Sequence, residues 1–80
     1  MAATITVRYW AGAQRAAGIE SEALSVSTIA ELRETLAARA GFDRLASVVS
    51  FLVDGQHAGD SERPPEGAVV DVLPPFAGGC

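Results

Sequence analysis

The chain has 80 residues, of which 49% are hydrophobic and 20% are charged, and its formal net charge is −4 at pH 7. This length predicts one small domain with little room for an enclosed active site, which favours a carrier, binding or subunit role. All six basic residues are arginines scattered along the sequence, so no nucleic acid partner is expected. No apolar run is long enough to cross a membrane, and the N-terminus lacks a signal-peptide pattern. With a single cysteine, a cytoplasmic protein without a membrane partner is the expectation.

Two strands are predicted at the start of the chain. Residues 3–10 alternate between apolar and polar side chains, which is typical of a half-buried strand. Residues 11–18 are small or polar and end in glycine, so they predict a loop or a short helical turn. Residues 20–26 alternate again but are less hydrophobic. They predict an edge strand that forms an antiparallel hairpin with the first strand.

The main helix has a clear start signal. Thr28 and Glu31 have the spacing of a capping box, in which each side chain satisfies a backbone N–H of the first turn. Three apolar residues then recur at helical spacing and predict a buried face: Ile29, Leu32 and Leu36. Gly41 stands where a helix stop is expected, so the predicted helix covers residues 28–40.

The second half of the chain is predicted to contain three more strands. The segments in order are a short helix or turn at 42–49, a buried strand at 51–53, a turn at Asp54-Gly55, a brief strand at 56–58, a loop at 59–67 and a last strand at 68–73. The last strand is almost entirely apolar, so we expect it in the centre of the sheet and covered on both sides.

This order of elements predicts an α+β fold of the ubiquitin-like β-grasp type. One main helix packs across a mixed sheet of four to five strands. The predicted domain covers residues 1–73, and residues 74–80 form a flexible C-terminal tail.

Groups of residues that could carry out chemistry within the domain are missing from the sequence. His57 is the only histidine and is better explained as a solvated turn residue, while the Asp-Gly turn accounts for Asp54. No cysteine or carboxylate cluster has metal-ligand spacing, and no glycine-rich loop follows a strand and opens a helix. We therefore expect no metal and no tightly bound cofactor.

The tail is the candidate functional element. Pro74 and Pro75 cannot continue a sheet and favour an extended chain, and Phe76 is an apolar residue that a partner could bury. Beyond Ala77, Gly78-Gly79 has no side chains and can pass through a narrow channel. A frayed terminus that contains two glycines by chance is the alternative, because the chain has eight glycines. The whole run of residues 70–79 is far more specific than the glycine pair.

Three segments give the sequence a family resemblance. The first strand Ile5-Thr6-Val7-Arg8-Tyr9-Trp10, the pair Glu66-Gly67 and the run Leu73-Pro74-Pro75-Phe76-Ala77-Gly78-Gly79 resemble the small subunit of molybdopterin synthase and the related thiamine-type sulfur carriers. The Pro-Pro step favours the molybdopterin branch. Asp54-Gly55 stands where this family often has Asn-Gly, which is a conservative departure.

The resemblance implies a mechanism in which the partners supply the catalytic residues. A ubiquitin-activating-type adenylyltransferase uses ATP to adenylate the carboxylate of Gly79, and sulfur from a persulfide donor converts it to a thiocarboxylate. The tail, residues 74–78, then enters a channel in the large subunit of molybdopterin synthase, where the sulfur passes to a pterin precursor.

Cys80 departs from the family pattern because it places the carbonyl of Gly79 in a peptide bond. Three accounts remain open. In the first, a peptidase of the metal-dependent type that trims similar carriers removes Cys80. In the second, Cys80 is an artefact or is lost nonspecifically. In the third, Cys80 itself carries sulfur as a persulfide or is acylated. An exposed terminal thiol has no visible source of special reactivity.

Other functions are compatible with the same tail. The carrier could serve thiamine, cysteine or a sulfur-containing natural product, since the acceptor enzyme selects the pathway. A ubiquitin-like protein modifier would use the same activated glycine, and a plain interaction domain would leave the tail inert.

Overall fold

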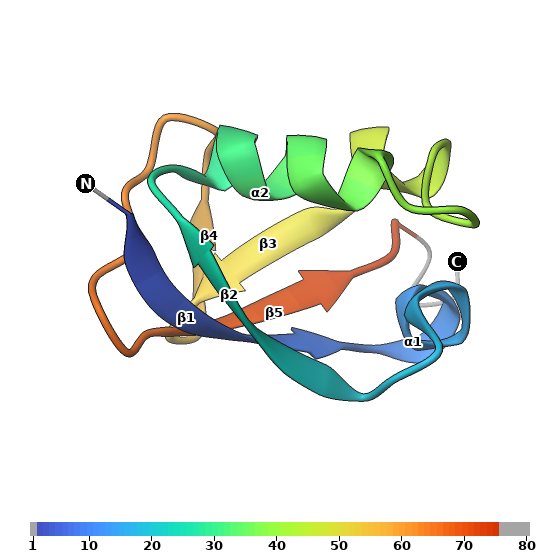
Figure 1. Ribbon diagram of the computed structural model, residues 1–80, viewed down its shortest axis with the longest axis horizontal. Helices are drawn as coiled ribbons and strands as arrows, with labels where there is room; N and C mark the ends of the chain where they lie inside the picture. The colour runs from blue at the N-terminus through green and yellow to red at the C-terminus, as the bar shows by residue number, and fades with distance from the viewer. Residues whose placement is uncertain (1, 76–80) are drawn as a thin grey trace.

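The computed structural model describes residues 2–75 as one mixed sheet with a helix across it (Figure 1). The elements in chain order are β1 (Ala3–Tyr9), α1 (Ala11–Ala17), β2 (Ser21–Val26), α2 (Ile29–Ala37), the 3₁₀ helix η1 (Leu45–Ser47), β3 (Ser50–Val53), β4 (Gln56–Ala58) and β5 (Val69–Leu73). The strand order is β2-β1-β5-β3-β4. β1 and β5 are parallel, and the other neighbours are antiparallel. The predicted α+β β-grasp architecture is confirmed.

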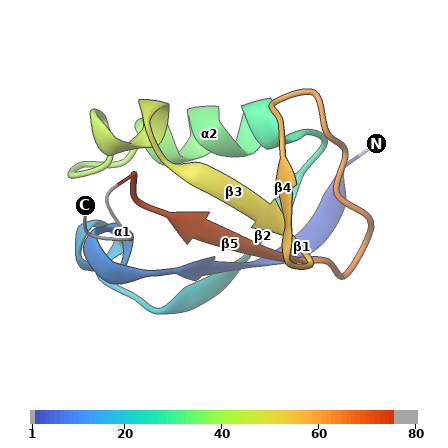
Figure 2. The same ribbon diagram turned by 180° about the vertical axis from the view of Figure 1, so that it is seen from behind.

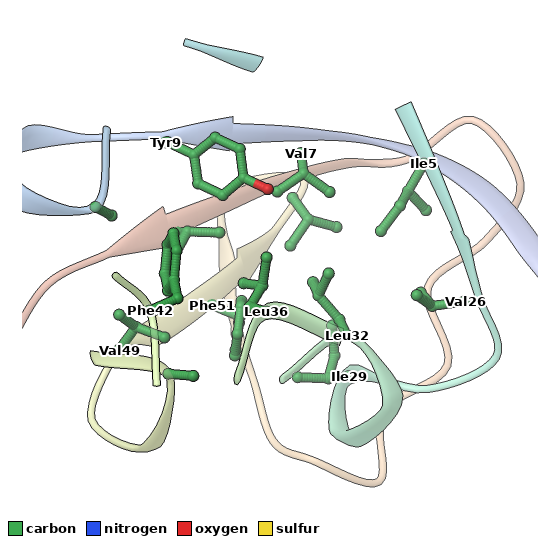
Figure 3. Packing of buried hydrophobic residues seen from close by; sticks show 14 of the residues in the cluster. Ile5, Val7, Tyr9, Val26, Ile29, Leu32, Leu36, Phe42, Val49 and Phe51 are labelled. Atoms are coloured by element: carbon green, nitrogen blue, oxygen red, sulfur yellow. The ribbon is translucent and has the colours of Figure 1, made fainter. Parts of the chain in front are cut away.

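The core lies between the sheet and α2. Alternate residues of β1 point toward the helix, so Ile5, Val7 and Tyr9 are at most 2% exposed while their neighbours face solvent. From the other side, Leu32 and Leu36 of α2 point into the same layer (Figure 3). The burial of this apolar surface is what stabilises the domain.

The predicted start of α2 is confirmed, but its predicted end is wrong. The hydroxyl of Thr28 accepts the backbone N–H of Glu31 at 3.1 Å, and the Glu31 carboxylate accepts the N–H of Ser27. The helix stops at Ala37, three residues before the predicted end at residue 40, and continues as turns. It stops early because the chain must reverse to bury Phe42, whose ring lies 5.8 Å from the ring of Tyr9.

Two ambiguous segments of the sequence are short helices in the structure. Within residues 11–18, α1 covers Ala11–Ala17 and is capped by Gly18, which has the left-handed conformation with φ +77°, where glycine carries no steric penalty. Residues 42–49 contain η1. α1 lies at one end of the sheet, beside the end of β5 (Figure 1).

β5 is central, as predicted, but it is covered on one face only. Val70 and Val72 point toward α2 and are fully buried. The opposite face carries no helix within residues 2–75 (Figure 2), and Val69 and Leu73 there are partly exposed. The expectation of cover on both sides is therefore wrong for this face. Of the β5 residues on this open face, only Asp71 is buried, because the side chains of Arg8 and Trp10 from the neighbouring strand and its end cover the carboxylate.

Candidate functional site at the root of the tail

The tail leaves the sheet directly from the end of β5. Leu73, the last residue of β5, pairs with Ser50, and the carbonyl of Val72 accepts the backbone N–H of Trp10 at 3.2 Å. Pro74 has no N–H to donate, so pairing cannot continue. We call residues 73–75 the tail root. The other predicted tail residues, Phe76, Ala77, Gly78, Gly79 and Cys80, lie outside the described residues, so their roles stay predictions.

A buried carboxylate lies next to the tail root. Asp71 accepts hydrogen bonds from Nε of Arg8 to Oδ1 at 2.7 Å and from Nη2 of Arg8 to Oδ2 at 3.2 Å. The indole Nε1 of Trp10 donates to Oδ1 at 3.0 Å. Arg8 and Asp71 meet because they are paired in register between the parallel strands β1 and β5. We call Arg8, Trp10 and Asp71 the Asp71 cluster.

The hydrogen bonds of the Asp71 cluster favour the ionised carboxylate. The bonds from Arg8 lower the pKa of Asp71 most, and the Trp10 N–H adds to this lowering, although burial acts in the opposite direction. Sequence reasoning missed this cluster. The signal was an aspartate in an otherwise apolar strand, since a charged residue in such a position requires a partner.

A second polar cluster connects the outer strand β2 to the turn after α2. Glu22 accepts hydrogen bonds from the hydroxyl of Tyr9 and from Arg39, whose Nη2 lies 3.1 Å from Oε1. The hydrogen bonds from Arg39 lower the pKa of Glu22. Burial is the main cause that raises the pKa of Tyr9 above its ordinary value, and the hydrogen bond to Glu22 is the second. Because no buried side-chain polar atom of this cluster lacks a hydrogen-bond partner, the cluster is accounted for as a structural cross-link between two elements.

The structure does not assemble a catalytic group from the other residues that were considered. His57 is exposed on β4, the strand at the opposite edge of the sheet from β2. Within residues 2–75, no three His, Cys, Asp or Glu side chains lie close enough to hold a metal ion. No helix in that part of the chain is long and apolar enough to span a membrane. The tail root and the surface around it are therefore the candidate site.

Comparison with known proteins connects this architecture to the tail. The model of the ThiS family matches residues 7–79, which is nearly the whole chain and ends at the second glycine of the Gly78-Gly79 pair. A search of curated proteins gives no match.

Solved structures share the fold at low sequence identity. A molybdopterin converting factor subunit 1 from Pyrococcus furiosus is 24% identical, with a TM-score of 0.81 over 91% of this chain and 98% of its own. The small archaeal modifier protein 1 from Methanosarcina acetivorans is 17% identical, with a TM-score of 0.81 over 99% of each chain. A protein–protein complex of subunits 1 and 2 of the molybdopterin-converting factor from Helicobacter pylori contains a chain that is 20% identical, with a TM-score of 0.68 over 90% of this chain and 93% of its own. These likenesses show the fold, and with the family match they confirm the resemblance found in the sequence.

Proposed function

This chain belongs to the ThiS family, and we propose that it is a sulfur carrier whose Gly79 is activated and converted to a thiocarboxylate. The observation that carries the proposal is the family match up to Gly79, which includes the whole Pro-Pro-Phe-Ala-Gly-Gly run. The fold supports it, because the central strand β5 ends at Leu73 and the prolines direct the chain out of the sheet.

The chemistry explains why the carrier needs a partner enzyme. A carboxylate is a poor electrophile, so its oxygen must first attack the α-phosphate of ATP, which releases pyrophosphate and forms an acyl adenylate. The terminal sulfur of a persulfide then attacks the acyl carbon and displaces AMP. Cleavage of the resulting acyl disulfide by a second thiol leaves the thiocarboxylate on Gly79. All catalytic groups in this scheme belong to the adenylating enzyme and the persulfide donor.

Activation requires cleavage of the Gly79–Cys80 bond, because an amide carbonyl has no free carboxylate to adenylate. We assign this step to a peptidase, of the metal-dependent type, that acts before the adenylating enzyme. Two other fates of Cys80 give different products. Nonspecific loss would not require a dedicated peptidase, and sulfur carried on Cys80 as a persulfide would leave the Gly79–Cys80 bond intact.

The proposed acceptor is the large subunit of a molybdopterin synthase in the cytoplasm. Two observations support it: the Pro74-Pro75 step, and the fold shared with a chain from the complex of subunits 1 and 2 of the Helicobacter pylori converting factor. Delivery of sulfur to thiamine, cysteine or a natural product is the alternative, and the acceptor that copurifies with the carrier distinguishes them. Failure to restore molybdoenzyme activity in a carrier-deficient strain would count against the molybdopterin pathway.

Intact mass spectrometry tests the carrier function directly. The full chain and a chain that ends at Gly79 are incubated with the adenylating enzyme, ATP and a persulfide donor. We expect the chain that ends at Gly79 to gain the mass difference between sulfur and oxygen. The full chain should do so only after loss of Cys80. If the chain that ends at Gly79 is never thiocarboxylated, the proposed function is wrong.

A ubiquitin-like modifier is the second candidate, because this fold is shared with the small archaeal modifier protein 1 at a TM-score of 0.81. In that case the activated Gly79 would acylate lysines of other proteins. Blots of cell lysate would then show conjugates of high mass that disappear when Gly79 is deleted. A lysate with thiocarboxylated carrier and no conjugates favours the sulfur carrier.

A further inference from the structure

β2 is an edge strand whose outer side pairs with no described part of the chain. Its residues, Ser21–Val26, pair with β1 on one side, and the strand order β2-β1-β5-β3-β4 leaves the other side open. Figure 1 shows β2 crossing in front of β1, with no described segment in front of it. An open edge of this kind offers backbone N–H and C=O groups to another strand.

The register with β1 identifies the backbone groups at this open edge. Tyr9 lies opposite Glu20, and its N–H donates to the Glu20 carbonyl at 2.8 Å, so this is a hydrogen-bonded pair. Hydrogen-bonded pairs alternate along antiparallel strands, so the backbone groups of Glu22 and Leu24 also face β1. The backbone groups that point outward belong to the residues in between: Ser21, Ala23 and Ser25.

The open edge lacks the features that keep edge strands from pairing. Protected edges carry lysine, proline or a bulge, or are very short. β4, at the opposite edge of the sheet, has only 3 residues. β2 has 6 residues without proline or lysine, and all of them pair with β1 in unbroken register. Its only charged residue, Glu22, is bound by Arg39 on the helix side. β2 is therefore suited to accept a further strand.

A second β2 fits this edge in the antiparallel direction. With a two-fold axis at Leu24, the two Leu24 side chains lie opposite one another on the helix side, where each is already partly buried against the core. Ala23 then lies opposite Ser25 of the second copy, and each such pair exchanges both of its backbone hydrogen bonds. No like charges meet, because Glu22 lies opposite Val26 of the second copy.

The same two-fold axis leaves both tails accessible. On the open face, the side chains at the junction are small and exposed, so they do not obstruct the approach of two copies: Ser21, Ala23 and Ser25. β5 of one copy runs antiparallel to β5 of the other, so the two tail roots lie at opposite ends of the joined sheet. Contact between the β2 strands therefore covers neither tail root.

We propose that β2 mediates a weak symmetric dimer of this chain, in which its outer edge pairs antiparallel with β2 of a second copy around Leu24. The two five-stranded sheets become one continuous sheet. Assembly stops at two copies, because the outer edges are then the short β4 strands. One strand edge buries less area than a stable dimer requires, so the dimer forms only at high protein concentration. This surface is separate from the tail root, and the inference does not depend on the proposed function.

Sedimentation equilibrium of the full chain tests the dimer, with a reductant present so that Cys80 forms no disulfide between copies. As the concentration rises to about 1 mM, the average mass should increase reversibly toward that of two chains. Added salt should strengthen the association, because each copy has a net charge of −4. Over the same concentrations, hydrogen exchange of the Ala23 and Ser25 amides should slow as the dimer forms.

Two lysine variants separate the edge from the rest of the sheet. Thr6 of β1 lies opposite Ala23, and both side chains are exposed, so Ala23→Lys and Thr6→Lys change the net charge equally on the same face. Ala23→Lys places a lysine of each copy at the junction and should raise the dimer dissociation constant about tenfold or more. Thr6→Lys lies one strand away from the edge and should leave the constant nearly unchanged. Thermal unfolding checks that both variants are folded.

Selective loss of the dimer in Ala23→Lys supports the proposal. A full chain that stays monomeric over the whole concentration range overturns it. Equal weakening by the two lysine variants, or amide exchange at Ala23 and Ser25 that does not depend on concentration, also overturns it, since the copies would then meet through another surface. If these amides slow only when a different protein is added to a monomeric chain, the edge belongs to that protein and the dimer is wrong. Thiocarboxylation of Gly79 decides the proposed function separately.

Discussion

Phe42 provides the sharpest test of how the chain reverses after α2. The ring is fully buried and packs against Tyr9, although a helix continued to residue 40 was predicted just before it. Complete burial of an aromatic side chain removes roughly 200 Å² from water, which corresponds to about 5 kcal/mol as an upper estimate. Phe42→Ala loses most of this contribution and leaves a cavity, so we expect a loss of about 3–5 kcal/mol in the free energy of unfolding.

This loss is large for so small a domain. Eighty residues give a total stability of roughly 4–12 kcal/mol, so Phe42→Ala should be partly unfolded or close to it at 25 °C. Phe42→Leu keeps an apolar side chain in the site and should cost less than half as much.

Urea unfolding followed by circular dichroism measures both variants. The midpoints should fall in the order wild type, Phe42→Leu, Phe42→Ala, with little change in the slope m for the folded variants. A loss below about 1 kcal/mol for Phe42→Ala would mean that the ring is not in the core, and the early end of α2 would lose its explanation.

Three further predictions concern the cap of α2, the Asp71 cluster and the tail. Thr28→Ala should lower the free energy of unfolding by about 1 kcal/mol in urea titrations. Thr28→Ser should not, because serine can cap the helix equally well, and equal losses in the two variants would contradict the capping role. The pKa of Asp71 is lowered in the folded state, so its ion pair stabilises at neutral pH and this stabilisation is lost as pH falls below about 4. The gap in melting temperature between wild type and Asp71→Asn should therefore narrow in acid, and a constant gap would refute this. Gly78→Leu should leave the melting temperature unchanged and abolish the thiocarboxylation seen by mass spectrometry. A normally modified variant would show that the tail does not need a residue without a side chain at this position.

Local patterns in the sequence were sufficient to predict most of the elements. Alternation in β1 and the capping box at Thr28 each involve neighbours within a few residues, so they can be identified without any tertiary contact. The end of α2 could not be predicted in this way. Gly41 looked like the stop, but the helix ends at Ala37 because a distant residue, Tyr9, provides the packing surface for Phe42.

The surroundings of the tail also depended on distant contacts. Arg8 and Asp71 are 63 residues apart in sequence, and the register of the parallel strands β1 and β5 alone makes them partners. No local pattern could therefore place Trp10 beside the tail root or distinguish the covered face of β5 from its open face.

The sequence by itself determined the fold class and the tail, because periodicity, capping and the Pro-Pro-Phe-Ala-Gly-Gly run are local properties of the chain. Only the tertiary structure decided which side chains surround the root of that tail. Trp10, Ile19 and Val48 come from separate connections, and they lie at the same end of the sheet because β1 and β5 end there while β2 and β3 begin there.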